Sequence, residues 1–122
     1  MIKRYLHTGI AVPSLDKAIR FYEGLGFQLE SKFHKPEPSA EVAQLVKNDA
    51  VFELWEFHDK EHSHVPYIRQ HIALYSDNLE ADVRKLVDSG YKVTIPDTHG
   101  VKLRYVFLQD ATGNNYEIAT QK

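Results

Sequence analysis

An internal repeat is the feature that most constrains how this chain of 122 residues can fold. The segment LHTGIAVPSLDKAIRFYEGLGFQL (6–29) corresponds to QHIALYSDNLEADVRKLVDSGYKV (70–93), and each contains a histidine, an apolar strand, an amphipathic stretch and a glycine. His7 and His71 lie 64 residues apart. Because such self-similarity is typical of duplicated structural units, we expect two copies of one unit.

The strand that ends each half follows the same offset. NDAVFELWEF (48–57) corresponds to TGNNYEIAT (112–120), so Glu53 and Glu117 are again 64 residues apart. Alternating and helical spacings predict one helix and four strands in each half. We expect strands at about 5–12, 27–34, 41–47, 50–57, 69–76, 91–95, 103–109 and 114–120, and helices at 15–23 and 79–89.

This order predicts an α+β fold of two tandem βαβββ modules in a single domain over 1–122. Module 1 spans about 1–57, a linker 58–68, and module 2 about 69–122. One helix covers only one face of each small sheet, so the other faces are expected to line a cup. In the second helix we expect Leu79, Val83, Leu86 and Val87 to face inward and Glu80 to pair with Arg84.

Composition excludes several classes of protein. The net charge of −2 gives no electrostatic case for binding nucleic acid or an anionic membrane. The chain has no cysteine, which excludes disulfides, a cysteine nucleophile and thiolate metal ligands. Its first residues show no signal peptide and no membrane span, so we expect a soluble cytoplasmic protein.

Strand alternation turns four polar residues away from the helices. Thr8, Ile10, Val12, Ile72 and Leu74 are the more apolar set of the first strands and are expected to face the helices. His7 and His71 then face the cup, and the last strands turn Glu53 and Glu117 the same way. A hydrogen-bonded His–Glu pair in each half is one interpretation. A divalent metal is the other, since it would neutralise two carboxylates and take imidazole as further ligands.

The sequence resembles the vicinal oxygen chelate superfamily, which includes glyoxalase I, bleomycin resistance proteins, extradiol dioxygenases and methylmalonyl-CoA epimerase. The resemblance covers almost the whole chain and rests on HTGIAVPSLDKAIRFYEGLGF, FELWEF, HIALYSDN and LQDATGNNYEI. It implies an eight-stranded cupped sheet around one metal ion, and either a site within one chain or one between swapped modules of a homodimer.

Within this family the His, Glu, His, Glu set most resembles bacterial glyoxalase I. The resemblance implies His7, Glu53, His71 and Glu117 as ligands of one divalent metal, with Ni or Co favoured and Zn, Mn or Fe as alternatives. It implies a lyase or isomerase that works through an enediolate, with Glu117 as the base and Glu53 as its symmetric partner. The epimerase usually has glutamine at the position of Glu53, and dioxygenases leave it without a ligand role.

The substrate is a small molecule that the sequence does not identify. Ala11 and Phe57 stand where glyoxalase I usually has an arginine and an asparagine that contact glutathione. Trp55, Phe57 and Tyr75 are candidate substrate-binding residues, with ordinary packing as the alternative. An extradiol-type dioxygenase and a non-catalytic drug-binding protein remain alternative functions.

Charged and histidine residues elsewhere receive simpler interpretations. His58, His62 and His64 in the linker could form a second metal site, but their spacing favours a solvated loop. Lys92, Lys102 and Arg104 could meet an anionic group of the substrate, and exposed surface charge is the simpler interpretation.

Overall fold

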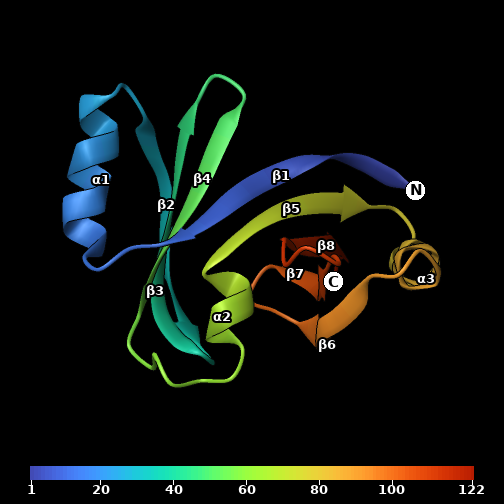
Figure 1. Cartoon of the computed structure of the whole chain (residues 1–122). Helices are drawn as coiled ribbons and strands as arrows, with labels where there is room; N and C mark the ends of the chain where they lie inside the picture. The colour runs from blue at the N-terminus through green and yellow to red at the C-terminus, as the bar shows by residue number, and fades with distance from the viewer. The chain divides into compact units, whose positions relative to one another are not determined.

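A computed structural model describes all 122 residues of the chain (Figure 1). The elements follow in the order β1 (Ile2–Ala11), α1 (Leu15–Gly24), β2 (Gln28–Pro36), β3 (Ser39–Lys47), β4 (Ala50–Phe57), α2 (Val65–Ile68), β5 (Gln70–Ser76), α3 (Leu79–Asp88), β6 (Lys92–His99), β7 (Leu103–Gln109) and β8 (Asn115–Gln121). This order confirms the predicted α+β class, with eight strands in two βαβββ modules. None of the helices has the length and apolar character needed to cross a membrane.

The chain forms two compact units. One unit contains residues 7–70, and the other contains residues 1–6 together with 71–122. The start of β1 therefore groups with the second half of the sequence. Within that unit the guanidinium of Arg4 lies 4.8 Å from the centre of the Tyr75 ring, a cation–π contact.

In the unit of residues 7–70 the strands are adjacent in the order β2-β3-β4-β1. β1 runs parallel to β4, and β3 is antiparallel to both β2 and β4. Ser14 is the N-cap of helix α1. Its hydroxyl oxygen accepts a hydrogen bond from the Lys17 N–H and so satisfies one donor of the first turn. The helix buries an apolar core against one face of the sheet, made of Leu15, Ile19, Ala43, Leu45 and Leu54.

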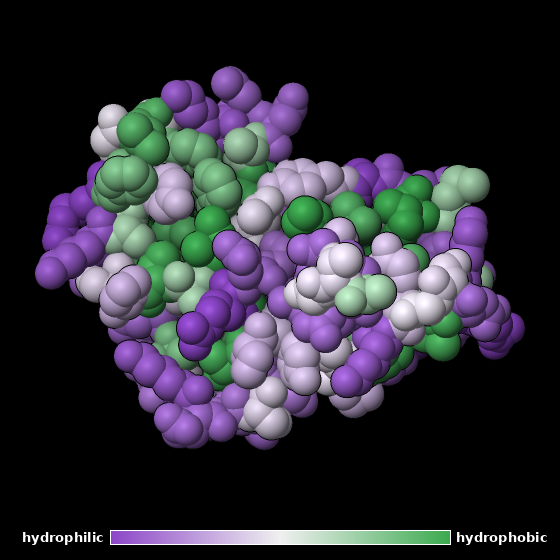
Figure 2. Space-filling view, viewed as in Figure 1, coloured by the Kyte–Doolittle hydropathy of each residue, from purple (hydrophilic) through white to green (hydrophobic).

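Part of the exposed surface beside α1 is apolar. Figure 2 shows hydrophobic residues gathered beside α1, and Phe21, Leu25 and Leu29 are the exposed large side chains of this region. The predicted inward set is confirmed here, because Ile10, Val12 and Phe52 pack against the α1 core. By strand alternation, Glu53 and Trp55 lie on the opposite face of the sheet.

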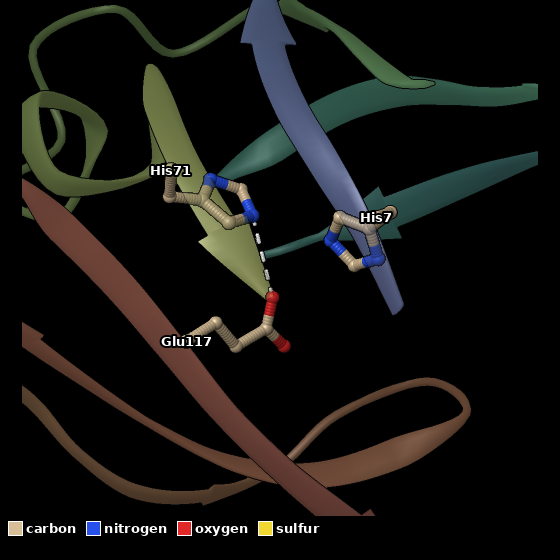
Figure 3. A group of neighbouring side chains, drawn as sticks. All are labelled: His7, His71 and Glu117. Carbon is tan, nitrogen blue, oxygen red and sulfur yellow. Dashed lines mark ion pairs between the residues drawn. The ribbon is translucent and has the colours of Figure 1, made fainter. Parts of the chain in front are cut away.

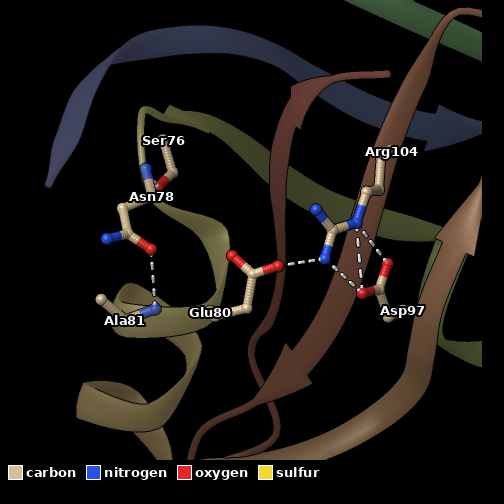
Figure 4. A network of polar contacts seen from close by, with 6 residues as sticks. All are labelled: Ser76, Asn78, Glu80, Ala81, Asp97 and Arg104. Atoms are coloured by element: carbon tan, nitrogen blue, oxygen red, sulfur yellow. Dashed lines mark hydrogen bonds and ion pairs between the residues drawn. The ribbon is translucent and has the colours of Figure 1, made fainter.

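The second unit repeats this arrangement with strand order β5-β8-β7-β6. The side chain of Asn78 caps α3 by accepting a hydrogen bond from the Ala81 N–H at 3.2 Å (Figure 4). The core beneath α3 consists of Leu79, Val106, Leu108 and Ile118, with Leu74, Val83, Leu86 and Tyr91 packed against it. Leu74 thus faces the helix as predicted.

Two of the apolar residues that were predicted to face inward are exposed, although Ile72 lies on the same face of β5 as Leu74. Ile72 is 41% exposed, because α3 packs on β7 and β8 rather than over the start of β5. Val87 is 44% exposed and lines a groove of 390 Å³ between α3 and β6. Val93, Pro96 and Asp97 of β6 also line this groove, and the register of β6 against β7 shifts between Ile95 and Thr98.

The predicted ion pair of Glu80 with Arg84 is also wrong. Glu80 instead pairs with Arg104 of β7, which donates to both oxygens of Asp97 on β6 (Figure 4). The ion pair with Asp97 fixes the guanidinium of Arg104 beside α3. Glu80 therefore pairs with this fixed guanidinium and not with the flexible side chain of Arg84 on its own helix. Hydrogen bonds from Arg104 lower the pKa of Asp97 and of Glu80. Arg104 is therefore engaged by carboxylates of its own unit.

Candidate functional site

The first candidate pair joins β1 to β4. In their parallel register Gly9 lies opposite Glu53, which brings the side chain of His7 to the same face. His7 Nε2 lies 3.3 Å from Glu53 Oε1, and the two residues are only 6% and 7% exposed. A buried carboxylate requires compensation by donors or by a cation, so this pair is a functional candidate and not a surface contact.

Neighbouring side chains hold the carboxylate of Glu53 in place. Gln44 Nε2 donates to Oε2 at 2.8 Å, and Trp55 Nε1 donates to Oε1 at 3.1 Å. Both oxygens are therefore hydrogen-bonded, and the carboxylate has a fixed orientation. Gln44 is absent from the sequence predictions. The signal for it was available, because Gln44 is a polar residue in an apolar strand directly opposite Glu53.

The second candidate pair joins β5 to β8. Ala73 lies opposite Glu117 in their parallel register, which is the relation that Gly9 has to Glu53. His71 Nε2 lies 3.3 Å from Glu117 Oε1 (Figure 3), and the side chains are 0% and 11% exposed. The ring of His71 packs edge-on against Phe107, with ring centres 4.9 Å apart. The repeat therefore produces two buried His–Glu pairs of equal separation.

The chemistry of these donors suits a divalent metal. His7, His71 and Glu117 are side chains that could hold a metal ion, each offering one nitrogen or oxygen ligand atom. Neutral imidazole and ionised carboxylate are common ligands of zinc, nickel and iron in proteins. All three residues are buried, as metal ligands of an enzyme centre usually are when solvent access is controlled. Glu53 is held by donors from its own sheet.

Aromatic side chains continue the face that carries Glu53. Trp55 and Phe57 are each 6% exposed and stack with ring centres 5.4 Å apart. The ammonium of Lys35 lies 6.0 Å from the Trp55 ring, and Lys35 is itself buried. Lys35 has no signal in the sequence beyond its place in β2. Ala11 lies directly opposite Trp55 in the parallel register of β1 and β4.

The surroundings of Tyr75 differ from those of Trp55 and Phe57. Tyr75 is half-buried and presents a ring face to Arg4 in the unit of residues 71–122 and 1–6.

The linker is not simply a solvated loop, because it contains the short helix α2 with Val65 and Ile68 buried. Burial lowers the pKa of His64, and the neighbouring charge of His62 lowers it further.

The comparisons with known proteins agree with this architecture. The sequence model of the Glyoxalase/Bleomycin resistance protein/Dioxygenase superfamily matches residues 4–118. Among curated proteins none matches the sequence. Among solved structures, a hypothetical protein from Bacillus halodurans C-125 is similar with a TM-score of 0.81 and 24% identity, over 98% of this chain and 94% of that chain.

Two methylmalonyl-CoA epimerases are similar to the same degree. The enzyme in complex with methylmalonyl-CoA and NH4+ gives a TM-score of 0.82 and 25% identity, over 99% of this chain and 96% of that chain. The enzyme from Mycobacterium tuberculosis gives 0.81 and 23%, over 99% and 89%. These likenesses agree with the paired βαβββ modules. The match of the family model over residues 4–118 shows that the chain belongs to the Glyoxalase/Bleomycin resistance protein/Dioxygenase superfamily.

Proposed function

We propose that this protein is a metal-dependent enzyme that moves a proton between neighbouring carbons of a small substrate bound through two adjacent oxygens. The repeated buried His–Glu pair, with 3.3 Å between nitrogen and oxygen in each half, is the observation that carries the proposal. His7, Glu53, His71 and Glu117 are the proposed ligands, and Ni or Co is the favoured ion. The family resemblance supports their convergence on one ion, within one chain or across a homodimer.

A bound divalent ion would supply Lewis-acid stabilisation of negative charge on the two substrate oxygens. The carboxylate of Glu117 accepts the proton from one substrate carbon and returns it to the next, as a general base and then a general acid. His71 lies against that carboxylate and orients it. Gln44 and Trp55 keep Glu53 fixed while the substrate changes, which avoids reorganisation during the reaction.

Glyoxalase I-like chemistry on a hemithioacetal of methylglyoxal, through its enediolate, is the specific reaction that we favour. Glu53 supports it, because a carboxylate at this position matches the four-ligand set of glyoxalase I. Ala11 and Phe57 lack the usual glutathione contacts, so we expect another thiol or a smaller adduct to serve as substrate. Trp55 and Phe57 would bind the apolar part of that substrate, with Tyr75 as a further candidate.

Epimerisation of an acyl-CoA is the second candidate. It is favoured by the similarity to two methylmalonyl-CoA epimerases. It also begins with removal of a proton from a carbon beside a carbonyl group, but the proton is returned to that same carbon on its other face. The two candidates share the removal of a proton by Glu117 and differ in the substrate and in the carbon that regains the proton. A single set of assays can therefore separate them.

The test begins with metal analysis of the purified chain, followed by loading with Ni, Co, Zn, Mn or Fe. Each form is assayed with methylglyoxal plus glutathione or other small thiols, and with methylmalonyl-CoA in D2O to detect proton exchange. Turnover of a hemithioacetal supports the glyoxalase-like reaction, and exchange at methylmalonyl-CoA alone supports the epimerase.

Variants and further outcomes complete the test. Glu117→Gln should remove either activity, while Glu30→Gln, an exposed carboxylate of β2, should retain it. Ring cleavage of a catechol by the Fe form would replace both candidates with a dioxygenase. Tight drug binding by a metal-free and inactive protein would replace them with a binding function.

A further inference from the structure

A second group of histidine and glutamate side chains lies on the opposite face of the sheet from Glu53. Glu41 of β3 is directly opposite His34 of β2 and, on its other side, Glu56 of β4. Glu41 shares its face with Ala43 and Leu45, which pack under α1. Directly opposite residues of neighbouring strands lie close enough for their side chains to interact. This face therefore carries a polar row beyond the α1 core.

His58 extends that row by one step past the end of β4. Its backbone N–H donates to the Ser39 carbonyl at 2.8 Å, so the chain continues beside β3 after the last residue of the strand (Figure 1). Because His58 is two residues beyond Glu56, it projects to the same face. Three neighbouring segments of chain thus present two imidazoles and one carboxylate together.

The contacts of this group are made through one oxygen. His34 Nδ1 lies 2.6 Å from Glu41 Oε2, and His58 Nε2 lies 3.2 Å from the same atom. The two rings are stacked, with centres 6.5 Å apart. The hydrogen bonds from His34 and then His58 lower the pKa of Glu41. The oxygen of Glu41 and the two imidazole nitrogens lie close together. A small divalent cation can bind all three atoms directly, in place of the hydrogen bonds between them.

The neighbouring charges leave the group available to a cation. Glu56, the remaining carboxylate of the row, accepts a hydrogen bond from the Leu15 N–H at the start of α1 at 2.6 Å. Lys32, in the next row of β2, is 3.5 Å from Asp16 of α1 and is directed towards that helix. The side chains of His34, Glu41 and His58 are 54%, 35% and 45% exposed. They can therefore adjust their rotamers around an ion that keeps water in its other positions.

We propose that His34, Glu41 and His58 form a second metal site, which binds a divalent transition-metal ion of the Zn²⁺ type. Two imidazoles and one carboxylate are a sufficient protein ligand set for such an ion, with water completing the coordination. The ion would cross-link β2, β3 and the segment that follows β4. This site is separate from His7, Glu53, His71 and Glu117 and does not depend on their proposed role.

Zinc titration of the metal-free full-length chain, by calorimetry with ZnCl2 and metal analysis after dialysis, tests the site. If the buried centre also binds, about two ions per chain are expected for the wild type, and His34→Ala or His58→Ala should remove one. Glu41→Gln should weaken that step at least about tenfold, because the amide is a poorer ligand than the carboxylate. Retained binding of the other ion would show that these exposed substitutions leave the fold intact.

Matched controls use histidines outside the group. His62→Ala and His64→Ala, in the same segment, and His99→Ala, on β6, should bind as the wild type does. His71→Ala should lose the ion of the buried centre and keep the surface ion, which separates this inference from the proposed function. Unchanged zinc binding in His34→Ala and His58→Ala would overturn the site. Equal loss in the His62 or His64 variants would also overturn it, since binding would then belong to the histidine-rich segment in general.

Discussion

The two His–Glu pairs have the same separation but different surroundings. In the first pair, Gln44 and Trp55 donate to the two oxygens of Glu53. In the second, the ring of His71 packs against Phe107 beside Glu117. The two halves therefore share the His–Glu separation, but the residue directly opposite the glutamate differs: it is Gln44, which donates to Glu53, in the first half and Phe107, which packs on His71, in the second. This asymmetry is what we expect if the carboxylates have different tasks.

The largest expected effect separates the two glutamates. Glu117→Gln should lower kcat by about 10²- to 10⁴-fold, the usual contribution of a general base. Glu53→Gln should lower it by about 10- to 100-fold, since the amide can keep a hydrogen bond and a place near the ion. Steady-state kinetics with the substrate identified by the assays measures both. Equal losses in the two variants would break the comparison, because both carboxylates would then share one role.

The next effect concerns the imidazoles. His7→Ala and His71→Ala should each weaken metal uptake by the buried centre, since each removes one proposed ligand. His71→Ala should in addition destabilise the fold by about 1–3 kcal/mol, because a fully buried ring that packs on Phe107 is lost. Metal analysis and thermal unfolding of the metal-free variants measure the two effects separately. A metal-free His71→Ala protein as stable as the wild type would contradict the packing role.

A smaller effect is expected from the donors that hold Glu53. Gln44→Leu should weaken metal binding or kcat/KM by about 10-fold, as loss of an outer hydrogen bond to a ligand does. Gln28→Leu, an exposed glutamine of β2, is the matched control and should behave as the wild type. If Gln44→Leu matched this control, the hydrogen bonds of Glu53 would have no part in its function.

The smallest effect is expected in the turn that precedes β8. Hydrogen bonds to the carboxylate of Asp110 form a network in this turn, and the turn at Asn48 in the first half has no equivalent network. Hydrogen bonds from Asn114 and then Thr112 lower the pKa of Asp110 from 3.8 to about 2. Because the pKa is lowered on folding, Asp110 stabilises the protein above about pH 4, and this contribution is lost as the pH falls towards 2.

Asp110→Ala should therefore lower Tm slightly at pH 6, and its difference from the wild type should vanish towards pH 2. Thermal unfolding of both proteins across this range is the measurement. A difference that stays constant down to pH 2 would show that the ionised carboxylate of Asp110 is not its cause.

The sequence was sufficient to predict the parts of the fold that follow from periodicity. The offset of 64 residues located both modules and the four residues of the two pairs, because strand alternation and duplication act over short, regular distances. What it missed depends on contacts between distant segments. Glu80 pairs with Arg104 and not with Arg84, because Asp97 holds the Arg104 guanidinium in place. The spacing of residues along the helix cannot predict this contact with another strand.

The same reason explains the missed residues of the candidate sites. Gln44 and His34 each acquire a partner through cross-strand register, which hairpin length sets and local propensity does not. Ile72 and Val87 were expected to be buried from their apolar character, but burial depends on where α3 lies over the strands. Sequence patterns predict well on which face of a strand a residue lies. They predict poorly which parts of that face are covered by a helix.

The hydrogen bond from the indole to Glu53 has a practical consequence. Trp55 is the only tryptophan of the chain, so the tryptophan fluorescence of the protein comes from one buried ring that donates a hydrogen bond to the Glu53 carboxylate. Any ligand or ion that changes the charge or position of the Glu53 carboxylate acts directly on that chromophore. The emission spectrum thus reads out the occupancy of the first His–Glu pair without a label.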